Sequence, residues 1–481
     1  MKYKNPIIVQ DFSDPDVIRV GDDFYMVASS FNYTPGVPIL HSKNLVDWEI
    51  INYVYDKIPF EEFNEVQHGC GCWAPSIRYH DGWFYVVMPF PDQGIYVSKT
   101  KDPYGKWSDL WCLIPGSGLE DPCPIWVDDK AYLVIGFIKS RIGFNSKLAI
   151  YEVSTDLTKQ ISETYTIVYD GHDMNPTIEG PKFNQRNGYY YIMAPAGSVK
   201  TGWQTCLRSK NIYGPYEAKI VLLQNDSKIN GPHQGALIDI DDNDNWAFIH
   251  FTDQDCYGRI TCLEPVEWIN DWPICGMVKD KEGGLGGTPV LENDYLLDIK
   301  SDYHLDMSDD FKKDLNLHWQ TPANIDEDWY YVFNGLYLKG VNTSKPLHLV
   351  ENVFSQKINY YDFNASVKIS EISSTAGLCI TGMNYAYICL ENGFVKIKEG
   401  SFSGDEKVVF EIEYDKKEIT FGVYFRYPGV YYFKYNDVLL KQYKFKAVKG
   451  RWVGSRIGLF SINGWYSKFQ DFKVKGVKRN G

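Results

Sequence analysis

Three acidic residues of this chain occupy the same position in a repeated pattern, and a proline follows each of them closely. Asp14 and Asp121 directly precede a proline, and Glu179 is followed by Gly180-Pro181. Because a proline ring fixes φ and removes a backbone donor, we expect these acids at strand starts or bulges. Carboxyl groups that converge on one centre repel one another when ionised, which raises the pKa of at least one of them. Such a cluster would provide a proton donor beside a carboxylate base.

Glycoside hydrolysis requires a pair of this kind, in which one carboxyl group protonates the leaving oxygen and the other acts on water or on the anomeric carbon. The alternative at each single position is an ordinary turn, since these dipeptides are common in turns. The shared register of all three acids favours a common site. Asp16 lies two positions beyond Asp14 and would share its strand face at a deeper level, so we expect a structural role for it.

The elements that would position these acids are short strands. Five times in the first 250 residues, a turn leads into aromatic and β-branched residues, which is typical of a tight turn before a strand. Successive turns are separated by 48 to 60 residues and are centred on Asp22, Gly82, Lys130, Gly188 and Asn245. Periods of this length with several short strands each are typical of propeller blades. The pattern predicts a five-bladed β-propeller over residues 1–297, with the acids on the innermost strands.

The repeat stops near Pro289, and the strands that follow lack the acidic register. Their alternation of apolar and polar residues suits two sheets packed face to face. We predict a C-terminal β-sandwich of the jelly-roll, concanavalin-like type over residues 303–481. The expected fold class is therefore all-β.

Composition limits the partners of the chain. A net charge of −13 argues against nucleic acid, whose binding needs clustered Lys and Arg. No apolar run approaches the roughly 20 residues that span a bilayer, so we expect no membrane association. The ten cysteines show no paired CxxC spacing and are expected to be reduced thiols. The start, Met1–Pro6, has no apolar signal region, so we expect a cytoplasmic protein; the alternative is a signal peptide that was removed and replaced by a methionine.

Several segments together resemble glycoside hydrolase family 43, and most closely its β-xylosidase and α-L-arabinofuranosidase branch. The resemblance rests, in chain order, on Asp11–Tyr25, Ser29–Trp48, Trp73–Ile77, Asp121–Leu133, Glu179–Lys182, Gly258–Ile260, Asp310-Phe311, Leu317–Gln320 and Val453–Phe460. It implies an inverting mechanism in which Asp14 is the general base and Glu179 the general acid. Asp121 would raise the pKa of the acid and orient it. An inverting enzyme holds its base and acid about 6.5–9.5 Å apart to admit a water.

The resemblance also implies substrate contacts. Arg259 matches a family arginine near the sugar ring, and Phe31 and Trp73 are candidates for the walls of the terminal subsite, with ordinary core packing as the alternative. His233 matches a motif whose histidine faces an axial calcium or its waters in relatives. The alternative for His233 is a buried structural histidine, because calcium prefers oxygen ligands. We expect no required cofactor, and a calcium, if bound, would be structural.

The preferred hypothesis is an exo-acting hydrolase that removes terminal β-D-xylosyl units, and α-L-arabinofuranosyl units, from xylo-oligosaccharides or arabinoxylan fragments. A homo-oligomer is left open. One alternative is an endo-arabinanase of the same family, and another is a non-catalytic carbohydrate-binding propeller, which would have no need for three crowded acids. A five-bladed fructan or sucrose hydrolase is disfavoured because its Asn-Asp-Pro-Asn-Gly motif is missing near the start.

Overall fold

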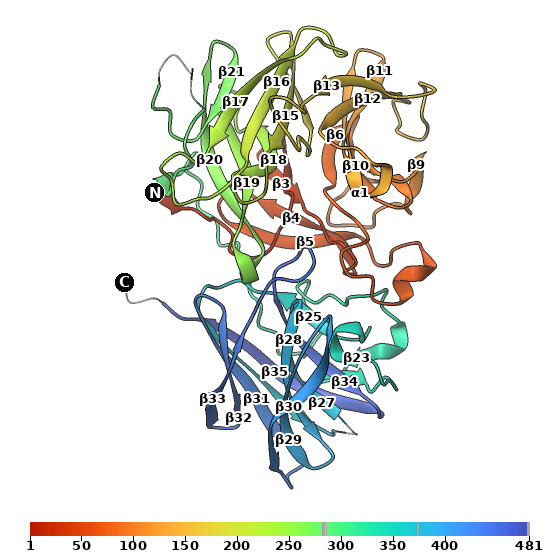
Figure 1. Cartoon of the computed structure of the whole chain (residues 1–481), viewed down its shortest axis with the longest axis vertical. Coiled ribbons are helices and arrows are strands. Elements are labelled where there is room, and N and C mark those ends of the chain that lie inside the picture. The colour runs from red at the N-terminus through yellow and green to blue at the C-terminus, as the bar shows by residue number, and fades with distance from the viewer. Residues whose placement is uncertain (281–283, 285, 373–374, 479–481) are drawn as a thin grey trace.

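The computed structural model is built almost entirely from strands, and the all-β prediction is confirmed (Figure 1). It describes residues 1–280, 284, 286–372 and 375–478. Its helical segments are short: α1 (Lys139–Ile142), η1 (Glu61–Asn64), η2 (Asp255–Tyr257), η3 (Glu327–Trp329) and η4 (Leu347–Leu349). In the described part of the chain, no helix is long and apolar enough to cross a membrane.

The N-terminal part contains five four-stranded antiparallel sheets, each made of four consecutive strands. The first sheet holds β2 (Asp16–Val20), β3 (Asp23–Val27), β4 (Gly36–Ser42) and β5 (Trp48–Tyr55). The second holds β6 (Ser76–His80), β7 (Trp83–Phe90), β8 (Gly94–Thr100) and β9 (Trp111–Pro115). The third holds β10 (Leu119–Val127), β11 (Lys130–Phe137), β12 (Lys147–Val153) and β13 (Thr166–Asp170). The fourth holds β14 (Lys182–Arg186), β15 (Tyr189–Ala196), β16 (Trp203–Ser209) and β17 (Glu217–Leu223), and the fifth holds β18 (His233–Asp239), β19 (Trp246–Asp253), β20 (Arg259–Ile269) and β21 (Trp272–Cys275).

The first strands of these sheets form a closed ring. β2 contacts β6, β6 contacts β10, β10 contacts β14, β14 contacts β18, and β18 returns to β2. The two ends of the ring are tied together by the pairing of β1 (Lys2–Lys4) with β22 (Glu292–Asp294) and by a bridge between Ile8 and Thr261. The first strands of the five sheets therefore surround one common axis.

The three acids lie at strand starts or in a bulge, as the prolines that follow them predict. Asp14 lies just before β2, Glu179 just before β14, and Asp121 in a bulge of β10 where the register with β11 shifts. Asp16 is fully buried one level deeper and accepts hydrogen bonds from the Ile77 backbone at 2.9 Å and the Arg78 guanidinium at 2.6 Å. This ion pair holds the first two sheets together, as expected for a structural residue.

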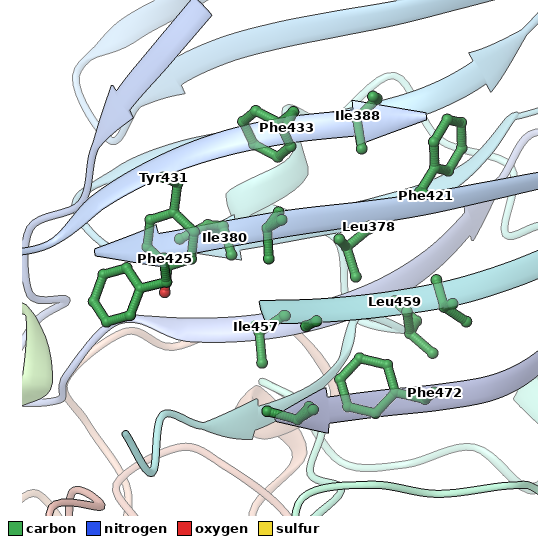
Figure 2. Packing of buried hydrophobic residues seen from close by; sticks show 14 of the residues in the cluster. Leu378, Ile380, Ile388, Phe421, Phe425, Tyr431, Phe433, Ile457, Leu459 and Phe472 are labelled. Atoms are coloured by element: carbon green, nitrogen blue, oxygen red, sulfur yellow. The ribbon is translucent and has the colours of Figure 1, made fainter. Parts of the chain in front are cut away.

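The C-terminal part is a sandwich of a seven-stranded and a six-stranded sheet. The first sheet has the order β23 (Tyr330–Val332), β24 (Leu336–Lys339), β35 (Tyr466–Gly476), β26 (Phe363–Ser370), β31 (Ile419–Arg426), β32 (Val430–Tyr435) and β33 (Val438–Lys446). The second has the order β25 (Phe354–Lys357), β34 (Arg456–Ile462), β27 (Thr375–Thr381), β28 (Asn384–Glu391), β29 (Phe394–Ser401) and β30 (Gly404–Glu413). Figure 2 shows the core between the sheets, where Leu378 and Ile388 of one sheet face Phe421 and Phe433 of the other.

The sandwich packs tightly against the ring, below it in Figure 1. Its core cluster includes Tyr257 and Ile260 of the ring. Arg456 at the start of β34 is 2% exposed, and its guanidinium lies 4.1 Å from the ring centre of Tyr33 in the N-terminal part. The backbones of Thr34 and Thr321 exchange hydrogen bonds of 3.0 and 2.8 Å across the boundary. The two parts therefore share buried apolar and polar contacts.

Candidate active site

One cavity of about 290 Å³ at the ring brings the predicted acids together. Six of the seven residues that the sequence singled out line this cavity: Asp14, Phe31, Trp73, Asp121, Glu179 and Arg259. His233 does not line it. The cavity is also lined by residues that the sequence did not single out, among them Glu120, Gln234 and Trp452.

Asp14 is held by two donors. Ser29 Oγ donates to Asp14 Oδ2 at 2.6 Å, and Arg259 Nη1 lies 3.1 and 3.3 Å from the two oxygens. The backbone of Asp14 is left-handed, with φ of 55°, a conformation that costs on the order of 1 kcal/mol for a residue with a Cβ. The charge-assisted bonds from Arg259 fix the direction of this carboxylate at the cavity wall.

Asp121 has the same backbone conformation, with φ of 54°, and its two oxygens are both hydrogen-bonded. The Gly180 backbone N–H donates to Oδ2 at 2.8 Å, and Gln234 Nε2 donates to Oδ1 at 3.0 Å. Gly180 has φ of 59°, and a Cβ there would lie 2.8 Å from the Gln234 side chain, which explains the glycine between the acid and the proline. Burial raises the pKa of Asp121 to about 6, and the bond from Gly180 opposes this rise.

Glu179 lacks the donors that Asp121 has. Within the described part of the chain, its carboxyl group accepts no hydrogen bond, and the His233 imidazole Nε2 lies 3.4 Å from its Oε1. Burial in the cavity and the charge of Asp121 raise the pKa of Glu179 to about 8, against the opposing charge of Arg259. Hydrogen bonds to the charged form favour ionisation, so the proton of this pair resides on Glu179 at neutral pH.

His233 lies behind the acids rather than among them. Its imidazole is 1% exposed and packs against the Phe251 ring at a centroid distance of 5.3 Å. Burial lowers the pKa of His233 to about 3, so the ring is neutral. Neither ring nitrogen has a hydrogen-bond partner, but the described residues contain no group of three or more acidic, cysteine or histidine side chains that could hold a metal. Calcium prefers oxygen ligands, so the imidazole would reach such an ion only through a water, and calcium here stays a prediction.

Phe31 and Trp73 form one wall of the cavity. Their rings lie 6.4 Å apart at an interplanar angle of 60°. Phe31 exchanges backbone hydrogen bonds with Cys72, at 2.8 and 3.0 Å, and the Trp73 indole donates to the Gly69 carbonyl at 3.1 Å. These bonds join the loops of the first two sheets and fix both rings at the edge of the cavity.

Trp452 closes the cavity from the sandwich. It lies in the loop between β33 and β34, with its ring edge-on to Trp73 at 6.2 Å and 6.0 Å from the Arg259 guanidinium. The indole is 48% exposed, so its position depends on the loop that carries it.

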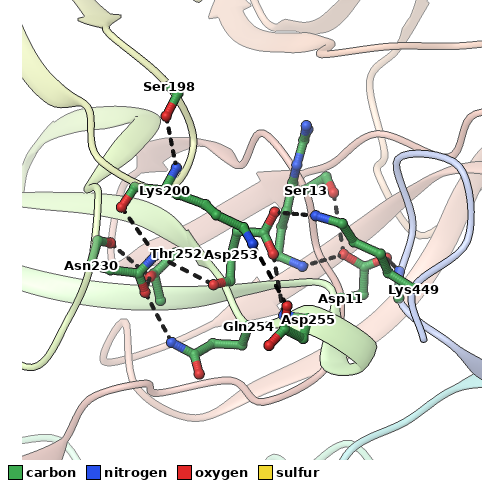
Figure 3. A network of polar contacts seen from close by, with 12 residues as sticks. Asp11, Ser13, Ser198, Lys200, Asn230, Thr252, Asp253, Gln254, Asp255 and Lys449 are labelled. Carbon is green, nitrogen blue, oxygen red and sulfur yellow. Dashed lines mark hydrogen bonds and ion pairs between the residues drawn. The ribbon is translucent and has the colours of Figure 1, made fainter. Parts of the chain in front are cut away.

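That loop is anchored to the ring by charged groups. Lys449 Nζ donates to Asp253 Oδ2 at 2.6 Å, a contact drawn in Figure 3. Asp11 accepts from the Gly454 backbone with one oxygen and from the Arg259 backbone with the other, both at 2.8 Å. The same carboxylate therefore fixes the sandwich loop and the residue that holds Asp14.

Two family models match this chain. One, described as glycosyl hydrolases family 43, matches residues 3–273. The other, described as the beta xylosidase C-terminal concanavalin A-like domain, matches residues 308–475. The chain belongs to glycosyl hydrolase family 43. It is thus a glycoside hydrolase, and family 43 enzymes need no cofactor for catalysis. The prediction of the family from the sequence motifs is confirmed.

Relatives within family 43 carry two kinds of name. A Xylanibacter ruminicola protein whose name provisionally places it among the beta-xylosidases is 36% identical over 476 residues, covering 95% of this chain and 85% of its own. A beta-xylosidase of Formosa agariphila is 35% identical over 58% of this chain and 52% of its own. A non-reducing end alpha-L-arabinofuranosidase of Bacteroides ovatus is 33% identical over 57% of this chain and 53% of its own. This chain thus spans about half the length of the last two.

Solved family 43 structures share the fold over nearly the whole chain. The Bacteroides ovatus xyloglucan-locus GH43B protein superposes with a TM-score of 0.82 at 25% identity, over 99% of this chain and all of its own. The BlXynB protein of Bacillus licheniformis superposes with a TM-score of 0.84 at 24% identity, over 98% of this chain and 99% of its own. The second likeness supports the fold alone.

Among the residues of this family 43 cavity that escaped the sequence analysis are Glu120, Gln234 and Trp452. Gln234 directly follows His233. The sequence motif indicated a role for the histidine alone, whereas in the structure the glutamine donates a hydrogen bond to Asp121. Glu120 adjoins Asp121, where strand alternation would place it on the opposite face. Trp452 stands in the second half of the chain outside any register, so no sequence signal connected it to the acids.

Proposed function

We propose that this family 43 enzyme is an inverting exo-hydrolase that releases terminal non-reducing β-D-xylosyl units, and α-L-arabinofuranosyl units, from xylo-oligosaccharides or arabinoxylan fragments. The observation that carries the proposal is the unequal hydrogen bonding of three acids in one cavity. Within the described residues, Asp14 and Asp121 are each held by hydrogen-bond donors, whereas Glu179 has none and its pKa is raised to about 8. The names of the relatives support xylosyl and arabinofuranosyl groups as substrates.

In the proposed mechanism, Glu179 gives its proton to the glycosidic oxygen as the bond to the anomeric carbon breaks. Asp14 accepts a proton from a water that attacks that carbon from the opposite face, so the product has the inverted configuration. Ser29 and Arg259 orient the Asp14 carboxylate for this transfer. Asp121 keeps a negative charge beside Glu179, which favours the protonated form of the acid until the leaving group takes the proton.

An exo mode is supported by the aromatic wall of the cavity. Phe31 and Trp73 from the ring and Trp452 from the sandwich line it together. A cavity bounded by the second domain suits a chain end, whereas an endo-arabinanase needs a groove open in both directions. A binding protein without activity would have no use for a protonated acid beside two held carboxylates.

The proposal includes the architecture that positions the site. We interpret the closed ring of five four-stranded sheets as a five-bladed β-propeller, with residues 1–297 and 303–481 as the two domains. Residues 479–481 at the end of the second domain lie outside the described residues. A cytoplasmic location stays a prediction.

Rates on four substrates test the proposed function. We expect turnover of p-nitrophenyl β-D-xylopyranoside, p-nitrophenyl α-L-arabinofuranoside and xylobiose, and only monosaccharide from linear arabinan. Early release of arabino-oligosaccharides would indicate an endo-acting enzyme instead. Tight sugar binding without turnover of any substrate would favour the binding-protein alternative.

A further inference from the structure

The cavity contains a fourth carboxyl group, that of Glu120, to which the mechanism gives no role. We propose that Glu120 is a substrate-binding residue whose carboxyl group hydrogen-bonds a hydroxyl group of the terminal sugar. The inference rests on the proposed function, because it assigns a specificity contact to the same site.

The backbone of β10 explains how two consecutive acids reach one cavity. In a regular strand, neighbouring side chains point to opposite faces. Here the register with β11 shifts between Glu120 and Cys123, and Asp121 between them has a left-handed φ of 54°. A bulge of this kind redirects a side chain, so Glu120 and Asp121 both line the cavity.

The partner strand leaves space for both groups. Gly136 of β11 pairs with Glu120, and a Cβ at Gly136 would lie 3.3 Å from Glu120 Cγ and 3.6 Å from Asp121 Oδ2. A larger side chain at this position would press on both carboxyl groups. The lack of a side chain at Gly136 therefore leaves room for both carboxyl groups.

Glu120 differs from Asp14 and Asp121 in having no hydrogen-bond partner among the described residues. Asp14 is bonded by Ser29 and Arg259, and Asp121 by two N–H donors. In the described residues, no hydrogen bond or ion pair reaches the Glu120 carboxyl group, although the residue is only 9% exposed. The Glu120 carboxyl oxygens are not fully enclosed by protein atoms, so they face the cavity and can bond a molecule that enters it.

The surroundings favour the protonated form of this carboxyl group. Burial, followed by the charges of Asp121, Glu179 and Asp14, raises the pKa of Glu120 well above its ordinary value. A neutral carboxyl group has one O–H donor and an acceptor oxygen. A sugar hydroxyl also donates and accepts, so the two groups can exchange a pair of bonds.

A thermodynamic cycle that combines substitutions of Glu120 with removal of single hydroxyl groups from the substrate tests the inference. Wild type, Glu120→Gln and Glu120→Leu are each assayed on p-nitrophenyl β-D-xylopyranoside and on its 2-deoxy, 3-deoxy and 4-deoxy analogues. We expect Glu120→Leu to lose roughly tenfold in kcat/KM on the parent glycoside. On one deoxy analogue, the leucine variant should equal wild type, because the lost hydroxyl and the lost carboxyl group form the same contact. Glu120→Gln keeps a donor and an acceptor and should lose less than the leucine variant.

The controls separate a contact from a structural effect. Glu399→Leu replaces a partly buried glutamate of β29 that does not line the cavity, and it should show no coupling to any hydroxyl. Far-UV circular dichroism checks each fold, and Glu120→Ala repeats the cycle if the leucine variant does not fold. Because Glu120 is uncharged, Glu120→Gln should leave the pH profile of kcat/KM unchanged.

Three results would overturn the inference. The first is that the losses of kcat/KM from Glu120→Leu and from hydroxyl removal are additive for each of the three hydroxyl groups. The others are a Glu120→Gln variant as impaired as Glu120→Leu, or a shifted pH profile of kcat/KM in Glu120→Gln. If these occur while wild type turns over the pentosides, only the role of Glu120 fails. Wild type without activity on either aryl pentoside would instead overturn the proposed function, and the inference with it.

Discussion

Asp121 is buried and Glu179 is partly buried in the same cavity, and among the described residues the protein provides hydrogen bonds only to Asp121. Two N–H donors stabilise the charge of Asp121, and Glu179 has none within the described residues. The pKa of Glu179 is therefore the higher of the two, about 8 against about 6. At the scale of single residues, this difference supports Glu179 as the proposed proton donor.

Glu179→Gln should lower kcat on xylobiose by roughly 10²–10⁴-fold, since the variant cannot protonate the departing sugar oxygen. On p-nitrophenyl β-D-xylopyranoside the loss should be much smaller, because nitrophenolate leaves without a proton. Steady-state rates on the two substrates measure this contrast. Asp14→Asn is the matched control, and it should lose activity equally on both. An equal loss on both substrates for Glu179→Gln would refute its role as the acid.

The basic limb of the pH profile reports the proton on Glu179. The active form is protonated, so activity should fall as pH rises through a pKa of about 8. Asp121→Asn removes a negative charge that raises this pKa, so the limb should move to lower pH. The pH dependence of kcat/KM measures the shift. An unmoved limb, or one displaced to higher pH, would contradict the coupling between the two acids.

The residue scale also shows what the sequence can predict. Asp14, Asp121 and Glu179 share a register beside prolines, and a repeat in sequence becomes a ring in space. The resemblance implies that Glu179 carries the proton, but the contacts of Gln234 and the Gly180 amide with Asp121 form only on folding and could not be predicted. The position of Glu120 in the cavity could not be predicted, because it depends on a bulge in β10 that interrupts the regular alternation of side chains.

At the scale of elements, the loop between β33 and β34 completes a site that the ring otherwise builds. Its Trp452 packs edge-on to Trp73, and Lys449 and the Gly454 backbone hold the loop to acids of the ring. The strands of both domains follow from turn signals and alternation, which are local. The position of this loop depends on contacts between segments about 200 to 440 residues apart, which no local pattern encodes.

Trp452→Ala should raise KM for p-nitrophenyl β-D-xylopyranoside roughly tenfold through the lost aromatic wall. Its melting temperature should stay close to that of wild type, because the indole is half exposed. Trp465→Ala is the matched control, since Trp465 is 80% exposed on the sandwich and does not line the cavity. Equal KM values for the two variants would show that the sandwich takes no part in substrate binding.

At the scale of the whole molecule, the two domains share one interface rather than a flexible linkage. Tyr257 and Ile260 of the ring belong to the core cluster of the sandwich, and Arg456 is buried between the domains. Separating the domains would expose this apolar surface and remove the Arg456 guanidinium from the Tyr33 ring, although its hydrogen bonds to Ser355 and Gln320 lie within the sandwich. The sandwich thus stabilises the ring as well as closing its cavity.

Unfolding in urea should therefore proceed in one transition for the full chain. Far-UV circular dichroism and tryptophan fluorescence should give coincident curves, because losing one domain removes contacts from the other. Arg456→Ala should lower the midpoint. Two separated transitions in wild type would contradict the shared interface.

The central claim is that Asp14 and Glu179 act on opposite faces of a terminal pentose. Proton NMR of the first product formed from p-nitrophenyl β-D-xylopyranoside tests this directly, provided spectra are recorded before mutarotation. With the proposed inverting mechanism, we expect α-D-xylose as the initial product, followed by slow equilibration with the β anomer. Initial release of β-D-xylose would contradict it, because retention requires a covalent intermediate in place of the attacking water.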